Sequence, residues 1–342
     1  MKIIMDCFGA DHSPLENILG CQAAVKEYNV EIILTGDVAL LKKIITENKI
    51  DDKNFEFAEA SSVIEMLDDP MDIIRSKKNS SMGIALELLK NGKGDAMVSG
   101  GSTGALLSGA TFVVKRIKGI KRAALAGVMP TINAGKHVML IDSGANVECR
   151  AEMLDQFATM GSIYMEKVEK INNPRVGLVN NGAEESKGTE LYIQAHKLLK
   201  ENTSINFIGN VEPRGLMLDE CDVMVCDGFV GNMILKSVEG VGKFVSAKLK
   251  SMFYENLKTK ISGLVMNKQL KAMRKLMDYS EIGGVPLLGI AKPIIKAHGS
   301  SNANAYKNAI KQAVLYASSN IIQEIENNVI VNKAGNNDEN NE

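Results

Sequence analysis

Short apolar runs alternate with longer segments of helical periodicity, and this alternation is the feature that most narrows the fold of the chain. Because runs that are apolar on both faces are typical of parallel strands covered by helices, the pattern predicts an α/β layered fold with a mostly parallel sheet. The expected strands are Lys2–Cys7, Glu31–Thr35, Phe55–Ala58, Ala96–Ser99, Ala123–Val128, Val138–Asp142, Arg175–Val179, Ile205–Ile208 and Val223–Cys226. The expected helices are Leu15–Tyr28, Val38–Asn48, Met82–Asn91, Thr103–Arg116, Glu152–Val168, Lys187–Lys200 and Asn304–Asn327.

Length and charge restrict the class of protein further. The 342 residues are enough for one catalytic domain over residues 1–331, followed by a polar tail at 332–342 that we expect to be disordered. A net charge of −1 argues against a nucleic-acid partner. Five irregularly spaced cysteines make no disulfide framework, and no apolar stretch is long enough to cross a membrane. We therefore expect a cytoplasmic protein.

The segment from about 241 to 277 breaks the strand–helix alternation. It is helical and rich in lysine, and apolar side chains that include Leu257, Ile261 and Leu264 recur at helical spacing. We expect an inserted basic amphipathic hairpin, which Gly263 divides into two helices. The hairpin either packs on the core or on a second subunit, or contacts an anionic membrane or an acidic partner.

A small-residue turn, Ser99–Ala105, links an expected strand to an expected helix. Ser102 or Thr103 can cap this helix, and Gly104 leaves the backbone accessible to a ligand. The unpaired N–H groups at a helix start favour an anion such as phosphate. The alternative is a capped helix without a ligand.

Asp142–Asn146 repeats this arrangement at another strand end. Since ligands collect at the carboxyl ends of parallel strands, we expect Ser143 and Asn146 to face the same crevice as the first turn. Asp142 either orients a cation or stabilises the turn through the backbone.

Three further side chains are candidates for chemistry at strand ends. Lys187, at the start of an expected helix, can neutralise phosphate charge or simply be exposed. Asn232 can donate a hydrogen bond to an oxyanion or cap a helix. His298 can carry a proton or be structural.

Several common sites are missing from the sequence. It contains no Walker pattern, no strand–GxGxxG–helix unit, no GxSxG elbow and no paired CxxC spacing. The strand-end acids Asp6, Asp142 and Asp227 could bind a metal, although nothing in their spacing demands one, and the missing patterns disfavour a nucleotide cofactor.

Taken in order, the motifs resemble one family. Besides the turns already described, they include Asp6–Pro14, Glu184–Gly188, Asp227–Asn232 and Lys296–Ser301. Together they are similar to the bacterial fatty acyl-(acyl-carrier-protein):phosphate acyltransferases, the PlsX family. The resemblance runs from Asp6 to about Ile310. The chain departs from the family at Ala10, where the family usually has Gly, and at Ser102, where it usually has Asn.

The resemblance implies a Rossmann-like fold of the isocitrate dehydrogenase-like group and a homodimer without a metal. It implies inorganic phosphate and a long-chain acyl carrier protein as substrates. The acyl-phosphate product would pass to a membrane glycerol-3-phosphate acyltransferase, with the enzyme peripherally membrane-associated. The alternatives are a short-chain acyl-CoA phosphate acyltransferase, a dehydrogenase on the related fold, and a non-catalytic membrane-binding module.

Overall fold

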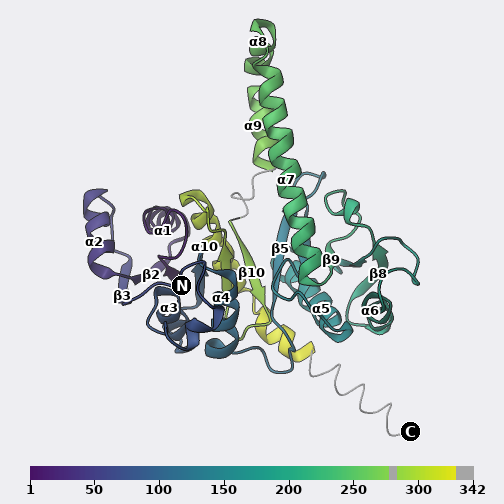
Figure 1. Ribbon diagram of the computed structural model, residues 1–342, viewed down its shortest axis with the longest axis horizontal. Coiled ribbons are helices and arrows are strands. Elements are labelled where there is room, and N and C mark those ends of the chain that lie inside the picture. Colours follow the sequence, from purple (N-terminus) through teal and green to yellow (C-terminus); the bar gives the residue numbers. More distant parts are fainter. Residues whose placement is uncertain (277–282, 329–342) are drawn as a thin grey trace.

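A computed structural model describes residues 1–276 and 283–328 of the chain (Figure 1). The strands are β1 (Lys2–Asp6), β2 (Glu31–Gly36), β3 (Phe55–Glu59), β4 (Ala96–Ser99), β5 (Ala124–Pro130), β6 (His137–Ile141), β7 (Arg175–Val179), β8 (Asn206–Val211), β9 (Val223–Val225), β10 (Gly284–Leu288) and β11 (Ile294–Ala297). The helices are α1 (Leu15–Tyr28), α2 (Val38–Glu47), α3 (Ser81–Lys90), α4 (Thr103–Gly109), α5 (Ala151–Lys167), α6 (Glu190–Glu201), α7 (Gly228–Phe253), α8 (Leu257–Val265), α9 (Asn267–Leu276) and α10 (Ala303–Ser318). Short 3-10 turns lie at Pro70–Ile74 and Pro213–Gly215, and a π-helical turn at Ala110–Val114 continues α4.

One sheet runs through the molecule in the order β3-β2-β1-β4-β11-β10-β5-β6-β9-β7-β8. Most neighbouring strands are parallel, which confirms the predicted α/β fold. The three antiparallel pairs are β11–β10, β10–β5 and β5–β6. Because the direction reverses three times between β11 and β6, the block β6, β9, β7 and β8 runs opposite to β1, β2, β4 and β11.

Strand β5 shows how the two faces of the sheet are covered. Ala124, Ala126 and Val128 point into the core packed by α1, α5, α6 and α10. Leu125 points to the opposite face, into the core under α3 and α4. Met129 joins a third core, on the same face as Leu125, where the first half of α7 packs. Helices α3, α4 and α7 therefore share one face.

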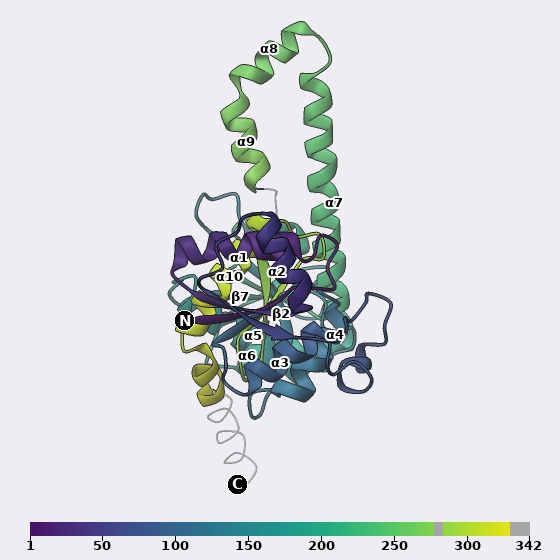
Figure 2. The ribbon, with the colours of Figure 1, turned by 90° about the vertical axis from the view of Figure 1, so that its left-hand side faces the viewer.

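The helical hairpin stands out from the sheet (Figures 1 and 2). Its first arm is longer than expected, because α7 begins at Gly228 and runs unbroken to Phe253. Gly263 does not divide the hairpin, since it lies inside α8; the chain breaks instead at the Asn256 cap and at Met266. The expected end at 277 lies outside the described residues, as does the predicted disordered tail.

Other differences concern the second half of the chain. The strands β10 and β11 were not predicted, and they join the two parallel blocks. These strands are short, and the segment between them contains Gly289 and Pro293. Their apolar residues show no clear periodicity, so the strands form because of the neighbours with which they pair. The last predicted helix ends at Ser318, and residues 321–328 form a separate helical segment.

Candidate active site

Three polar side chains stand side by side at the carboxyl ends of β1, β4 and β11. The strand register places Ser99 between Asp6 and Lys296. The Ser99 hydroxyl donates to Asp6 Oδ2 at 2.7 Å and accepts from the Gly101 N–H at 3.2 Å. Lys296 Nζ donates to the Gly100 carbonyl at 3.3 Å. The base of the 99–104 turn is thus held from both sides by side chains.

The acid and the lysine of this row have perturbed proton affinities. Burial raises the pKa of Asp6 to about 6, although hydrogen bonds and the nearby Lys296 charge oppose the shift. Burial also lowers the pKa of Lys296 to about 8, with the Asp6 charge acting in the opposite direction. Strongly perturbed pKa values of this kind cluster at functional sites.

The turn above this row caps a helix as predicted. The Ser102 hydroxyl accepts from the Ala105 N–H at 3.5 Å, and α4 begins at Thr103. Ser102 is buried, whereas Thr103 and Gly104 are partly exposed. The turn therefore presents its backbone and Thr103 outward, while the side chain at 102 serves the helix.

Gly100 is required by its surroundings. A Cβ at this position would lie 2.3 Å from the hydroxyl of Tyr306, which α10 supplies from beneath. The Tyr306 hydroxyl is buried and has no hydrogen-bond partner within the described part of the chain. Gly101, the residue after Gly100, is closely approached by Gly9: a Cβ added at Gly9 would lie 3.6 Å from the Gly101 Cα.

A hollow of about 370 Å³ lies where this Gly9 loop meets the segment after β3. Its lining residues are Phe8, Gly9, Ala10, Asp11, Ser13, Val63, Glu65 and Met66. The hollow lies next to the 99–104 turn, because Gly9 lines the hollow and also approaches Gly101.

The second predicted turn is built around a buried carboxylate. Asp142 accepts backbone N–H groups from Leu125 at 3.0 Å, Gly144 at 3.1 Å, Ala145 at 3.0 Å and Asn146 at 2.7 Å. Burial raises the pKa of Asp142, and these hydrogen bonds counteract the rise. Asp142 therefore stabilises the turn through the backbone, the structural alternative of the sequence analysis.

The two predicted phosphate contacts in this turn are engaged in local bonds. Asn146 Nδ2 donates to Asp142 Oδ2 at 2.8 Å and to the Ala123 carbonyl at 2.7 Å. The Ser143 hydroxyl donates to the Leu125 carbonyl at 3.1 Å. A side-chain contact to phosphate from either residue would exchange these bonds, so their assignment stays a prediction.

Asn232 lies beside the same turn. It does not cap α7, because Asp227 does: its carboxylate accepts from the Val230 N–H at 2.9 Å. The Asn232 side chain is exposed and approaches Gly144, whose Cβ would lie 3.7 Å from Asn232 Oδ1. Its amide is thus open to a ligand at this edge.

Lys187 precedes the helix on which we expected it, since α6 begins at Glu190. Its carbonyl accepts from Asn180 Nδ2 at 3.0 Å, and its N–H donates to the Glu184 carbonyl at 3.1 Å. The side chain is exposed, and across residues 1–276 and 283–328 its ammonium makes no ion pair. The backbone is fixed while the charge remains available.

His298 lies at the other edge, after β11. Its Nδ1 accepts from the Ser300 N–H at 3.2 Å and lies 2.8 Å from the Ser300 hydroxyl. Burial lowers the pKa of His298, and the charge of Glu239 on α7 opposes this shift while Lys236 adds to it. His298 therefore lies near the middle of α7.

The topology corrects the expectation that all turns share one edge. Ser102 and His298 follow strands of one block, whereas Asn146, Lys187 and Asn232 follow strands of the block that runs the other way. Helix α7 connects the two groups, because Asn232 borders one and Glu239 acts on the other. Asn232 and Glu239 are seven residues apart, which corresponds to about 10 Å along the helix axis. The candidate residues therefore lie along α7 in two groups and not at one shared edge of the sheet.

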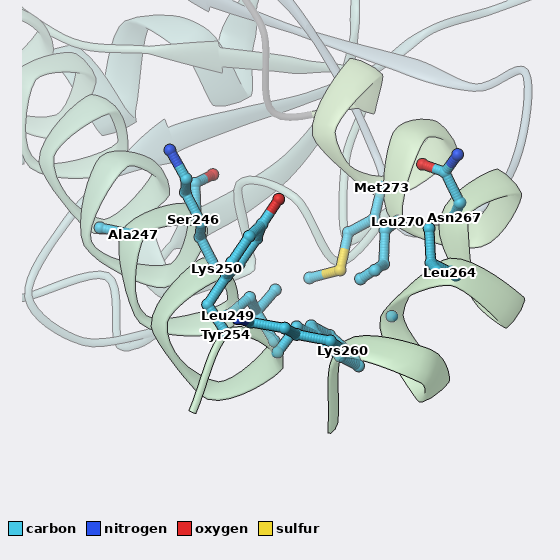
Figure 3. Close-up of a pocket in the computed structure, with 12 residues that line it drawn as sticks. Ser246, Ala247, Leu249, Lys250, Tyr254, Lys260, Leu264, Asn267, Leu270 and Met273 are labelled. Atoms are coloured by element: carbon cyan, nitrogen blue, oxygen red, sulfur yellow. The ribbon is translucent and has the colours of Figure 1, made fainter. Parts of the chain in front are cut away.

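A larger groove, of about 700 Å³, lies inside the hairpin (Figure 3). Leu249 and Tyr254 on one side lie across from Leu264, Leu270 and Met273 on the other. Position 250 is about 27 Å along α7 from Asn232, so the groove cannot hold the reacting groups.

Over the described residues no group of three or more His, Cys, Asp and Glu side chains could hold a metal ion. All five cysteines are free, as expected. Within the same residues no helix is long and apolar enough to cross a bilayer.

Comparisons with known proteins agree with this architecture. Residues 1–324 match the family model described as "Fatty acid synthesis protein". A phosphate acyltransferase of Clostridioides difficile (strain 630) is 43% identical over 342 residues, covering 100% of this chain and 99% of the relative. One from Clostridium botulinum (strain Loch Maree / Type A3) is 48% identical over 330 residues, covering 96% and 98%.

Solved structures share the fold at low identity. A phosphotransacetylase from Streptococcus pyogenes has a TM-score of 0.60 at 17% identity, covering 93% of this chain and 94% of that one. A putative 4-hydroxythreonine-4-phosphate dehydrogenase from Salmonella typhimurium has a TM-score of 0.54 at 10% identity, covering 92% and 99%. The fold is that of phosphotransacetylases and related dehydrogenases.

The chain has the α/β fold that phosphotransacetylases share, and its curated relatives place it in the class of phosphate acyltransferases. Within that class, the chain belongs to the PlsX family of phosphate acyltransferases. The resemblance read from the motifs is confirmed.

Proposed function

We propose that the protein transfers a long-chain acyl group from an acyl carrier protein to inorganic phosphate, which yields acyl-phosphate for phospholipid synthesis. The observation that carries this proposal is that the exposed Asn232 amide and the Lys187 ammonium, which makes no ion pair within the described residues, follow the carboxyl ends of the parallel neighbours β9 and β7. A cation and an amide donor are the groups that phosphate and a developing oxyanion require.

In this mechanism a phosphate oxygen attacks the thioester carbonyl carbon. Lys187 balances the phosphate charge, and the 99–104 turn holds it, with the backbone and Thr103 as the first contacts. Asn232 donates to the carbonyl oxygen as negative charge develops. The C–S bond then breaks, and the thiolate takes a proton for which His298 is the candidate donor. The protein holds both reactants in place, and phosphate is the nucleophile, so the chain supplies none.

The hairpin supports the lipid side of the proposal. Leu257, Ile261 and Leu264 on α8 are 75%, 55% and 75% exposed, and Lys258 and Lys260 lie between them. An exposed apolar face among lysines suits an anionic membrane surface or an acidic partner such as acyl carrier protein. We propose peripheral membrane association through α8, near a membrane glycerol-3-phosphate acyltransferase, with the enzyme as a homodimer.

The nearest alternative uses short-chain acyl-CoA, since neighbours of this fold include phosphotransacetylases. Parallel assays with palmitoyl-acyl carrier protein, palmitoyl-CoA and acetyl-CoA at equal phosphate concentration separate the donors. We expect the highest kcat/KM with the carrier protein. A higher kcat/KM with acetyl-CoA would show that the preferred acyl donor is short-chain acyl-CoA and would contradict the proposed substrate.

A further inference from the structure

The row Asp6–Ser99–Lys296 is a buried charged network that the residues assigned so far do not use. Asp6 and Ser99 are fully buried, and Lys296 is partly buried in the adjacent strand. An uncompensated charge in such surroundings is costly, so the acid and the lysine stabilise one another. A network of this kind needs a reason beyond stability, because apolar residues would pack there at least as well.

The geometry shows what the network holds. Lys296 Nζ donates to the carbonyls of Gly100 and Ala297, so it joins the 99–104 turn to the end of β11. On the other side, Asp6 anchors the Ser99 hydroxyl, which in turn accepts from the Gly101 N–H. The carbonyl of Gly100 and the N–H of Gly101 belong to one peptide group, which is therefore held by Lys296 at its carbonyl and by Ser99 at its N–H.

A second observation points to the same place. The buried Tyr306 hydroxyl, which has no hydrogen-bond partner within the described residues, is aimed at Gly100 from beneath. Any side chain at position 100 would collide with it. The position of Tyr306 therefore leaves room only for glycine at the base of the turn.

We propose that Lys296 is a positioning residue of the phosphate site: its ammonium fixes the Gly100–Gly101 peptide and adds positive charge beneath the turn that receives the anion. This inference rests on the proposed function, because it takes inorganic phosphate as the ligand. Lys296 acts through the backbone and through its charge, whereas Lys187 approaches phosphate from the opposite block of strands.

The charge of Lys296 responds to several neighbours. Asp6 faces it from β1 and opposes its loss of a proton. The nearby His298 is in turn affected by Lys296 itself, by Asp11 in the loop after β1, and by Glu239 and Lys236 of α7. Since burial lowers the pKa of Lys296 to about 8, its charge declines at mildly alkaline pH.

Binding of inorganic phosphate, measured by calorimetry, tests the inference without an acyl donor. We compare wild type with Lys296→Met and, as a control, with Lys292→Met in the loop before β11. Lys296→Met should weaken phosphate binding at least about tenfold near neutral pH, and Lys292→Met should not. Because the missing charge matters only while Lys296 is protonated, the ratio of the two affinities should shrink between about pH 7 and about pH 9.5.

Equal affinity of Lys296→Met and wild type would overturn the inference, as would a difference that does not change with pH. If Lys296→Met does not fold, the Asp6→Asn/Lys296→Met double variant, which leaves no unpaired charge, replaces it with the same expected loss. A wild-type protein that binds phosphate but makes no acyl-phosphate would refute the proposed function and leave this inference intact. A wild-type protein that binds no phosphate would overturn the inference.

Discussion

The Asn232 side chain stands beside Gly144, close enough that a Cβ at Gly144 would lie 3.6 Å from the Asn232 Cβ. The two residues come from different strand ends, after β9 and after β6, which are parallel neighbours. The contact brings an exposed amide of α7 against a turn whose backbone is fixed by Asp142. Asn232 is therefore held at a defined place while its amide faces outward.

Replacing Asn232 with Ala should remove an oxyanion donor and little else. We expect kcat to fall about 100-fold to 1000-fold, because loss of one such donor costs about 2.7–4 kcal/mol. The unfolding temperature should not change, since the side chain is exposed. Steady-state kinetics check the prediction, with Ser237→Ala on the same helix as the control. An Asn232→Ala enzyme with the kcat of Ser237→Ala would remove the residue from the mechanism.

Lys187→Ala should lose most acyl-phosphate formation and remain folded. The lysine is exposed and makes no ion pair within the described residues. The substitution therefore removes the positive charge opposite the phosphate but disturbs no packing. Lys200→Ala is the matched control, because that lysine is also exposed but pairs with Glu185. Turnover and circular dichroism are measured on all three proteins. Near-wild-type turnover in Lys187→Ala would refute its assignment.

Asp6 should make the stability of the protein depend on acid pH. Its pKa is raised from 3.8 to about 6 by burial, so the folded chain keeps a proton that the unfolded chain releases. The stabilisation is fully present below about pH 4 and is lost as pH rises through about 6, a change on the order of 3 kcal/mol. Urea unfolding at a series of pH values measures this change. Over this range the unfolding free energy of wild type should fall with rising pH more steeply than that of Asp6→Asn.

The exposed Asp52→Asn variant serves as the control for that experiment, because it should keep the wild-type slope. If Asp6→Asn and Asp52→Asn gave the same dependence on pH, Asp6 would titrate normally in the folded state.

The exposed face of α8 should bind anionic membranes. Changing Leu257, Ile261 and Leu264 together to Ser should reduce sedimentation with phosphatidylglycerol-containing liposomes at least about tenfold, since each buried side chain is worth about 1.5–3 kcal/mol. Turnover on a soluble donor should persist, because the hairpin is far from Asn232. Liposomes of phosphatidylcholine alone control for charge. Equal sedimentation of the two proteins would count against a membrane role.

The local chemistry of the chain could be predicted largely from the sequence, because strong signals act over short distances. The Ser102 cap, the strand Ala96–Ser99 and the helix Leu15–Tyr28 follow from capping residues and apolar periodicity alone. The start of α6 at Glu190, after Lys187, was missed because Gly188 adopts a positive φ and delays the helix.

The long-range arrangement could not be predicted in the same way. The reversal of strand direction depends on β10 and β11, whose few residues carry no periodicity, and it places the turns at 99–104 and 142–146 at opposite edges. The placement of Asp6 and Lys296 on either side of Ser99 depends on β11 too, so the sequence showed both residues only as members of separate motifs. The spacing of residues also does not reveal that the side chains of Ser143 and Asn146 donate hydrogen bonds to the carbonyls of Leu125 and Ala123.

The most direct test of the central claim is the conversion of palmitoyl-acyl carrier protein with and without inorganic phosphate, with the product trapped by hydroxylamine. The account predicts that, above the direct cleavage of the thioester by hydroxylamine in an enzyme-free control, palmitoyl hydroxamate and free carrier-protein thiol form in equal amounts, only when phosphate is present, and at a rate that saturates with phosphate. Release of thiol at the same rate without phosphate, or thiol without hydroxamate, would show that phosphate is not the acceptor and would contradict the account.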